Sequence, residues 1–172
     1  MNAWQVCRQI QYLIRSQDWT GSSSEVFHTD SVKITAAPRE RALEELIMPA
    51  CLIKPAGETG DKEESNLLEQ EIVITLAVSH AGDAFGEFPV VGGQRTGTTS
   101  SVGRGLLEIE EELFNAIERV DTDLGVVIVT VAKSAVAVAF VSEQYVLVRD
   151  YLFRARLTAD RYYHPVEDLR ET

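Results

Sequence analysis

Gly92 to Val120 read GGQRTGTTSSVGRGLLEIEEELFNAIERV, a glycine-rich segment that runs directly into a helical pattern. At about 100° per residue, the apolar side chains from Leu106 onward gather on one half of the helical wheel. They are Leu106, Leu107, Ile109, Leu113, Phe114, Ala116, Ile117 and Val120, whereas Glu108, Glu111, Glu112, Glu118 and Arg119 fall on the other half. The segment therefore predicts an amphipathic helix that packs on a core, with Ser100 or Ser101 as its N-cap.

One acidic residue, Glu110, breaks this pattern because it lies inside the apolar arc, between Ile117 and Phe114. A buried carboxylate without a partner is too costly to keep. In one interpretation, Glu110 lies at the rim of the core and its carboxylate reaches water or a local arginine. In the other, this helix face meets another subunit and Glu110 pairs across the contact.

The composition is that of an ordinary globular protein. The chain has 172 residues, of which 45% are hydrophobic and 25% charged, and this length predicts a single domain over 1–172. Its formal net charge of -11 and pI of about 4.7 disfavour a nucleic-acid-binding surface, because phosphate contacts need clustered lysine and arginine.

The two cysteines, Cys7 and Cys51, lie in apolar patterns without CxxC or metal-type spacing, so we expect reduced core thiols. The N-terminal residues carry Arg8 and Arg15 and do not resemble a signal peptide. The weakly charged segment Val126 to Val141 is rich in β-branched residues and is interrupted by Lys133-Ser134. It predicts two strands rather than a membrane-spanning helix.

The remaining patterns alternate between helix, strand and turn signals. They predict an amphipathic helix over 2–16, an extended segment over 26–37, a short helix after Pro38, strands over 50–54 and 69–79, and strands over about 125–132, 135–142 and 144–157. A projecting loop over about 56–67, a glycine-rich loop over about 82–104 and a polar tail over 160–172 complete the chain. The sum is an α+β fold with a largely antiparallel or mixed sheet of four to six strands and two main helices on one face.

Motifs for chemistry are weak. The glycine spacing of Gly92 to Thr99 resembles a phosphate-binding loop, but Thr98 stands where the lysine is needed and the helix begins too late. His28, His80 and His164 are not spaced as metal ligands, and no nucleophile lies in a recognisable elbow. We therefore predict no catalytic, cofactor-binding or metal-binding residues, and no enzymatic activity.

The order of segments is more informative than any motif. An amphipathic helix precedes PACLIKP, an acidic loop, LLEQEIVITLAV, a glycine-rich loop, LLEIEEELFNAI and the aromatic strand YLFRARL. From about Ala3 to Leu157 this order resembles the tail-terminator (tail-completion) proteins of long-tailed bacteriophages. The resemblance implies a structural virion protein of the tail or neck, assembled in the host cytoplasm. Such proteins form a homohexameric ring at the head-proximal end of the tail tube, end tube polymerisation and dock the tail to the head connector.

The implied partners are further copies of the chain, the tail-tube protein and the head-completion or connector protein, with DNA only passing through the lumen and no membrane contact. A ring needs side-to-side contacts that close. The interface candidates are Glu110, Arg149, Arg154 and Arg156, together with Asp61, Lys62, Glu63 and Glu64 of the acidic loop and Gly92, Gly93, Gln94 and Arg95 of the glycine-rich loop. The net negative charge suits a channel through which DNA slides, a hypothesis that fails if the lumen is lined by basic residues.

Three alternatives stay open. The chain is another part of the same machine, such as a connector protein or a tail-tube subunit; an enzyme whose glycine-rich loop is an active-site lid; or a monomeric host adaptor or binding domain. The sequence does not assign each loop to a neighbour, orient the ring, say whether the chain is monomeric before assembly, or give a role to residues 18–47.

Overall fold

The structure is a computed structural model that describes residues 3–60, 67–79, 90, 105–119 and 127–158. Its helices are α1 (Ala3–Arg15), the 3-10 turn η1 (Thr29–Ser31), α2 (Arg39–Leu43) and α4 (Leu106–Arg119). Its strands are β1 (Val32–Ile34), β2 (Ala50–Gly60), β3 (Leu67–Ser79), β4 (Val127–Lys133), β5 (Ala137–Val141) and β6 (Gln144–Thr158). Most of the elements expected from the sequence are therefore present.

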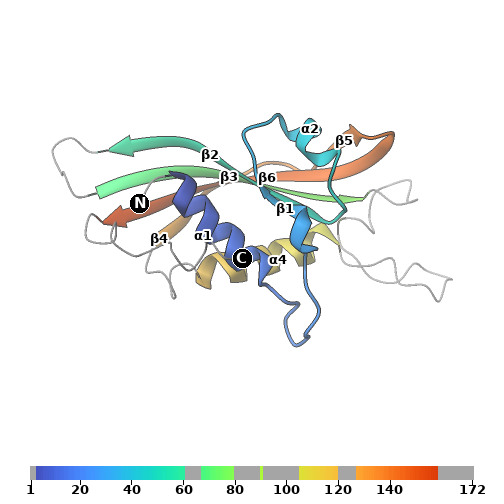
Figure 1. Ribbon diagram of the computed structural model, residues 1–172, viewed down its shortest axis with the longest axis horizontal. Coiled ribbons are helices and arrows are strands. Elements are labelled where there is room, and N and C mark those ends of the chain that lie inside the picture. Colours follow the sequence, from blue (N-terminus) through green and yellow to red (C-terminus); the bar gives the residue numbers. More distant parts are fainter. Residues whose placement is uncertain (1–2, 61–66, 80–89, 91–104, 120–126, 159–172) are drawn as a thin grey trace.

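A six-stranded sheet runs through the length of the molecule (Figure 1). The strand order is β1-β2-β3-β6-β4, and β5 pairs with β6 beyond the end of β4. β1 runs parallel to β2, whereas all other pairs are antiparallel. This sheet confirms the predicted α+β class with a largely antiparallel, mixed sheet.

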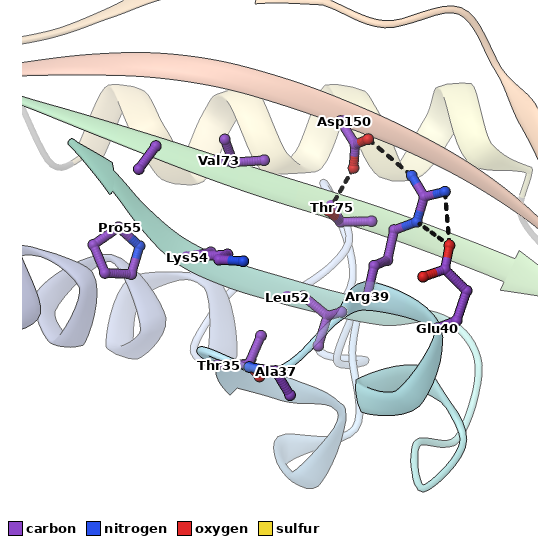
Figure 2. Close-up of a pocket in the computed structure, with 11 residues that line it drawn as sticks. Thr35, Ala37, Arg39, Glu40, Leu52, Lys54, Pro55, Val73, Thr75 and Asp150 are labelled. Carbon is purple, nitrogen blue, oxygen red and sulfur yellow. Dashed lines mark hydrogen bonds and ion pairs between the residues drawn. The ribbon is translucent and has the colours of Figure 1, made fainter.

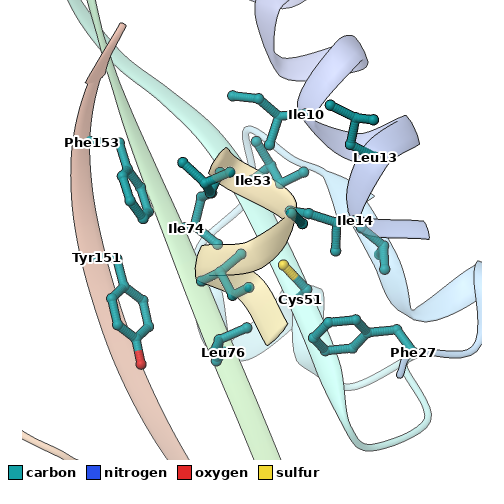
Figure 3. Close-up of a cluster of buried hydrophobic side chains, with 14 of the residues drawn as sticks. Ile10, Leu13, Ile14, Phe27, Cys51, Ile53, Ile74, Leu76, Tyr151 and Phe153 are labelled. Carbon is teal, nitrogen blue, oxygen red and sulfur yellow. The ribbon is translucent and has the colours of Figure 1, made fainter. Parts of the chain in front are cut away.

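The two main helices, α1 and α4, lie on the same face of this sheet (Figure 1), as predicted. The alternation of strand side chains explains the arrangement, because Ile72, Ile74, Leu76 and Val78 of β3 all enter the core beneath the helices. Figure 3 shows side chains of α1, β2, β3 and β6 gathered in this core, with Ile74 and Leu76 of β3 between those of α1 and the rings of Tyr151 and Phe153. The strand predicted over 69–79 is thus confirmed as part of β3.

The opposite face of the sheet is covered only in part. Leu43 of α2 packs there against Leu52, Ala139, Val141 and Val148 in a second, smaller core. Leu52 alternates with Cys51 and Ile53, which enter the first core, so the two cores lie on opposite faces. We call the rest of this second side, which includes Val73, Leu152, Arg154 and Arg156, the open face.

Two local predictions are wrong. The loop predicted over 56–67 is shorter, because β2 continues to Gly60 and β3 begins at Leu67; the antiparallel ladder between these strands outweighs the polar, glycine-containing composition. Ser100 or Ser101 is not the N-cap, because α4 begins at Leu106. The Gly105 carbonyl accepts a hydrogen bond from the Ile109 N–H (3.1 Å), and the Glu108 carboxylate accepts one from the Gly105 N–H (3.4 Å).

The segment 126–141 forms β4 and β5 from residue 127 onward, which confirms the two predicted strands. No helix within the described ranges is long and apolar enough to cross a membrane. The extended segment 26–37 contains β1, which was too short to be recognised. The tail 160–172 lies outside the described residues, as does the glycine-rich loop apart from Val90, which packs against the first core.

Candidate functional site

The exposed apolar side chains concentrate on one edge of the sheet. Seven of the eleven exposed large hydrophobic residues in the described part of the chain lie between residues 127 and 145. They are Val127, Val129, Val131, Val136, Val138, Phe140 and Tyr145. Single exposed apolar residues are ordinary, but a cluster along one edge indicates a contact surface.

The backbone of this edge has no strand partner on its outer side among the residues that the structure describes. β4 and β5 both pair with β6, and no strand in the described ranges pairs with their outer side. β4 is almost wholly exposed, with only Ile128 half-buried beside the first core. An exposed apolar edge strand is a template for pairing with another chain, and folded proteins usually block it.

The opposite edge of the sheet is blocked at one end and open at the other. β1 covers β2 only as far as Ile53. The outer side of β1 is closed by side chains, because the Val32 carbonyl accepts hydrogen bonds from Gln11 Nε2 (2.8 Å) and Arg15 Nη2 (3.0 Å). The rest of β2, Lys54–Gly60, has no strand on its outer side among the described residues.

Glu110 on α4 lies behind the apolar edge and is 8% exposed. Its carboxylate accepts hydrogen bonds from Arg149 Nη1 (2.9 Å) and the Tyr151 hydroxyl (2.9 Å) on β6, and from the Lys133 ammonium group at the end of β4. Lys133 also lies 4.5 Å from the centre of the Phe114 ring. The helix is thereby tied to the edge strand β4 and to β6, the strand with which β4 pairs.

The environment of Glu110 favours its charged form. Burial is the largest influence and raises the pKa, but the hydrogen bonds from Lys133 and Tyr151 and the charges of Arg149 and Lys133 together outweigh it. The pKa of Glu110 therefore lies below its ordinary value. This geometry agrees with the first interpretation of Glu110, in which its carboxylate reaches a local arginine. Because the carboxylate is satisfied inside the chain, the energetic reason to expect its partner on another subunit no longer applies.

Glu112, which the helical wheel assigns to the solvated half, is buried instead. Its carboxylate accepts hydrogen bonds from the Thr20 N–H (2.9 Å), the Thr20 hydroxyl (2.8 Å) and Gln17 Nε2 (2.8 Å). Burial raises the pKa of Glu112, but the hydrogen bonds lower it by a larger amount. The pKa of Glu112 therefore lies below its ordinary value. The segment after α1 is thereby held against α4, a long-range contact that a wheel cannot reveal.

We expect Glu112→Ala to lower the free energy of unfolding by about 2 kcal/mol, because the Thr20 N–H and hydroxyl lose a charged acceptor. Hydrogen exchange at the Thr20 amide should become faster in the same variant. Glu111→Ala, at an exposed neighbouring position, is the matched control and should change stability by less than about 0.5 kcal/mol. Unchanged exchange at Thr20 would contradict the contact.

The pH dependence of stability follows from Glu110 and Glu112, whose pKa values are both lowered in the folded state. In the unfolded chain the pKa of glutamate is about 4.3, so at acidic pH the unfolded chain binds more protons than the folded chain. The stabilisation is present above this value and is lost as pH falls through the folded pKa. The free energy of unfolding, measured with urea from about pH 7 to about pH 3, should show this loss. It should fall less steeply with decreasing pH in Glu110→Gln than in the wild type. Parallel profiles for the two proteins would contradict it.

The other predicted interface arginines are also paired within the chain, on the open face. Arg154 Nη2 lies 3.0 Å from a Glu71 oxygen, and Arg156 Nε lies 2.9 Å from a Glu69 oxygen. These pairs connect β6 to β3 in register. Asp61, Lys62, Glu63 and Glu64, and Gly92, Gly93, Gln94 and Arg95, lie outside the described residues.

A cavity of about 490 Å³ lies on the open face beside α2 (Figure 2). Leu52 and Val73 form part of its apolar lining. On its polar side, Arg39 Nη1 lies 2.9 Å from Asp150 Oδ2, and the Thr75 hydroxyl donates to the same aspartate. Because these charged groups satisfy one another, we interpret them as the attachment of α2 to the sheet.

The described residues contain little that points to chemistry. Burial raises the pKa of the Cys7 thiol to about 12 and also raises that of Cys51, so neither is a reactive thiolate at neutral pH. Within the described ranges, no group of three or more histidine, cysteine, aspartate or glutamate residues is arranged to hold a metal ion.

Sequence reasoning did not identify the apolar edge as a site. Its signal was present in the valines of segment 126–141, but alternation alone does not distinguish an edge strand from a central one. No protein-family model matches this chain, and no curated protein matches it.

Proposed function

We propose that this chain is a structural protein of the tail or neck of a long-tailed bacteriophage. In this proposal it forms a homohexameric ring at the head-proximal end of the tail tube, ends tube polymerisation and docks the tail to the head connector. The role is structural and requires no catalysis or cofactor. Assembly takes place in the host cytoplasm.

The observation that carries the proposal is that, within the described part of the chain, the sheet has two different open edges, the apolar β4 edge and the far part of β2. A side-to-side contact between two different surfaces of identical chains is heterologous, and such contacts produce either a closed ring or an open filament. In such an assembly each subunit has one neighbour at its β4 edge and another at its β2 edge. The segment order that resembles the tail-terminator proteins favours the closed ring.

The open face agrees with passage of DNA without binding. The cations of Arg154 and Arg156 are paired with Glu71 and Glu69, so they do not form a free basic patch. Phosphate binding requires cations that are available to replace counterions. If this face lines the lumen, DNA meets a surface with balanced charge.

A tail-tube subunit is the second candidate, because the same open edges suit a ring that stacks into a tube. Polymerisation of purified tail-tube protein in the presence of increasing amounts of this chain separates the two. We expect shorter tubes whose mean length, measured by electron microscopy, falls as the amount of chain rises. Tubes of unchanged length would contradict the terminator role, and incorporation along the whole tube would favour the tube-subunit role.

A further inference from the structure

We propose that neighbouring copies join by strand pairing, in which the outer edge of β4 in one copy pairs antiparallel with the Gly57–Gly60 part of β2 in the next. This inference rests on the proposed ring and names the surface that builds it. The sheet of one subunit then continues into its neighbour, and main-chain hydrogen bonds supply part of the contact energy.

The strand directions permit this pairing. β2, β3, β6 and β4 are successive antiparallel neighbours, so β4 runs opposite to β2 within one chain. Rotation about a ring axis roughly parallel to the strands preserves their directions. β4 of one copy therefore meets β2 of the next in antiparallel orientation, which needs no rearrangement of the chain.

The two open edges also lie at the same level of the sheet. Gly57 pairs with Glu71, Glu71 with Arg154 and Arg154 with Val129, so Gly57 and Val129 end the same row of residues. The next such row runs from Thr59 to Val127. On each edge the strand segment with uninterrupted register ends at a register shift. In β2 this shift lies between Pro55 and Gly57, and in β4 it follows Thr130.

The side chains at this junction are complementary in size. Val127 and Val129 are each 45% exposed and lie on the open face, in register with Arg156 and Arg154. Gly57 has no side chain, and a Cβ added there would have only one heavy atom within 4 Å, Glu71 Oε2 at 4.0 Å. A valine of the neighbouring strand can therefore approach the Gly57 backbone closely, which is a common reason for glycine within a strand.

The state of β1 and β2 limits where β4 of a neighbouring copy can pair at this edge of the sheet. The outer side of β1 is occupied by Gln11 and Arg15 through the Val32 carbonyl. β1 in turn covers β2 through Ile53. Among the described strands, the far part of β2 therefore remains without a partner on its outer side. It runs opposite to β4, so β4 of a neighbouring copy can pair with it in antiparallel orientation.

Cysteine crosslinking tests the pairing. We expect the double variant Gly57→Cys/Val129→Cys, oxidised mildly with tail tubes present, to form a ladder of covalent multimers on a non-reducing gel. Within one chain the two positions are three strand spacings apart, about 14 Å, which is too far for a disulfide. Each single variant should give no ladder, because native Cys7 and Cys51 are buried. Gly57→Cys with Val127→Cys tests a register shifted by two residues.

Val129→Lys should abolish ring formation, because a charge on the edge opposes strand pairing. Val138→Lys is the matched control: this residue is 57% exposed on β5, outside the proposed contact, and the variant should still form rings. Circular dichroism and thermal unfolding of both variants should match the wild type, since both positions are exposed.

The outcomes separate the interface from the function. Absence of a ladder in both registers, together with tube capping by Val129→Lys, would overturn the strand pairing and leave the terminator role intact. A ladder without any effect on tube length would support the pairing and overturn the terminator role. A ladder together with loss of capping in Val129→Lys supports both.

Discussion

Glu110→Ala is expected to lower the free energy of unfolding by about 3 kcal/mol at neutral pH, the cost of breaking a buried charge cluster by removing one partner. The buried Tyr151 hydroxyl loses its acceptor, and the Arg149 and Lys133 charges lose the carboxylate between them. Lys133 is the most exposed of the three and can turn to water, so most of the loss comes from the two β6 residues. Urea unfolding measures the change.

Two variants control this prediction. Glu110→Gln keeps the shape of the side chain and removes its charge, so its loss should lie between those of the wild type and the alanine variant. Glu111→Ala, at the exposed position next to it, should change stability by less than about 0.5 kcal/mol. Equal stabilities of Glu110→Ala and Glu111→Ala would contradict the assigned role of the cluster.

Phe153→Ala is expected to destabilise the fold by about 4 kcal/mol, the usual cost of an aromatic ring removed from a packed core. Phe153 is fully buried, and its ring centre lies 6.0 Å from that of Phe114 on α4 and 6.3 Å from that of Tyr151. The cavity would therefore open between β6 and α4, where the main helix rests on the sheet.

Leu152 provides the matched control because it is adjacent in β6 but lies on the open face and is half-buried. Leu152→Ala should cost about 1 kcal/mol, an ordinary value for a partly exposed position. Thermal and urea unfolding of the two variants compare the two faces of the same strand. Similar losses for both would contradict the assignment of one covered and one open face.

The fold could be predicted from the sequence where a single period ran over many residues. Ile72, Ile74, Leu76 and Val78 share one face of β3, and most of the apolar arc that the wheel predicts for α4 is buried. β1 was not identified because three residues carry no period, and its pairing with β2 depends on residues far away in sequence. The helix start was misplaced because Glu108, rather than a serine, supplies the cap.

The candidate site was less predictable for a related reason. The wheel identified Glu110 as unusual, but its partners Arg149 and Tyr151 come from β6, and only the folded chain brings them together. Glu112 was assigned to solvent because its partner Thr20 belongs to an irregular segment after α1. The open edge of β4 depends on strand order, which is a property of the whole sheet.

The most direct test of the proposed role is electron microscopy of this chain mixed with purified tail tubes, with averaging of the tube ends. We expect one additional ring at a single end of each tube and no further growth from that end. Bare ends, or the same subunit built in along the length of the tube, would contradict the account.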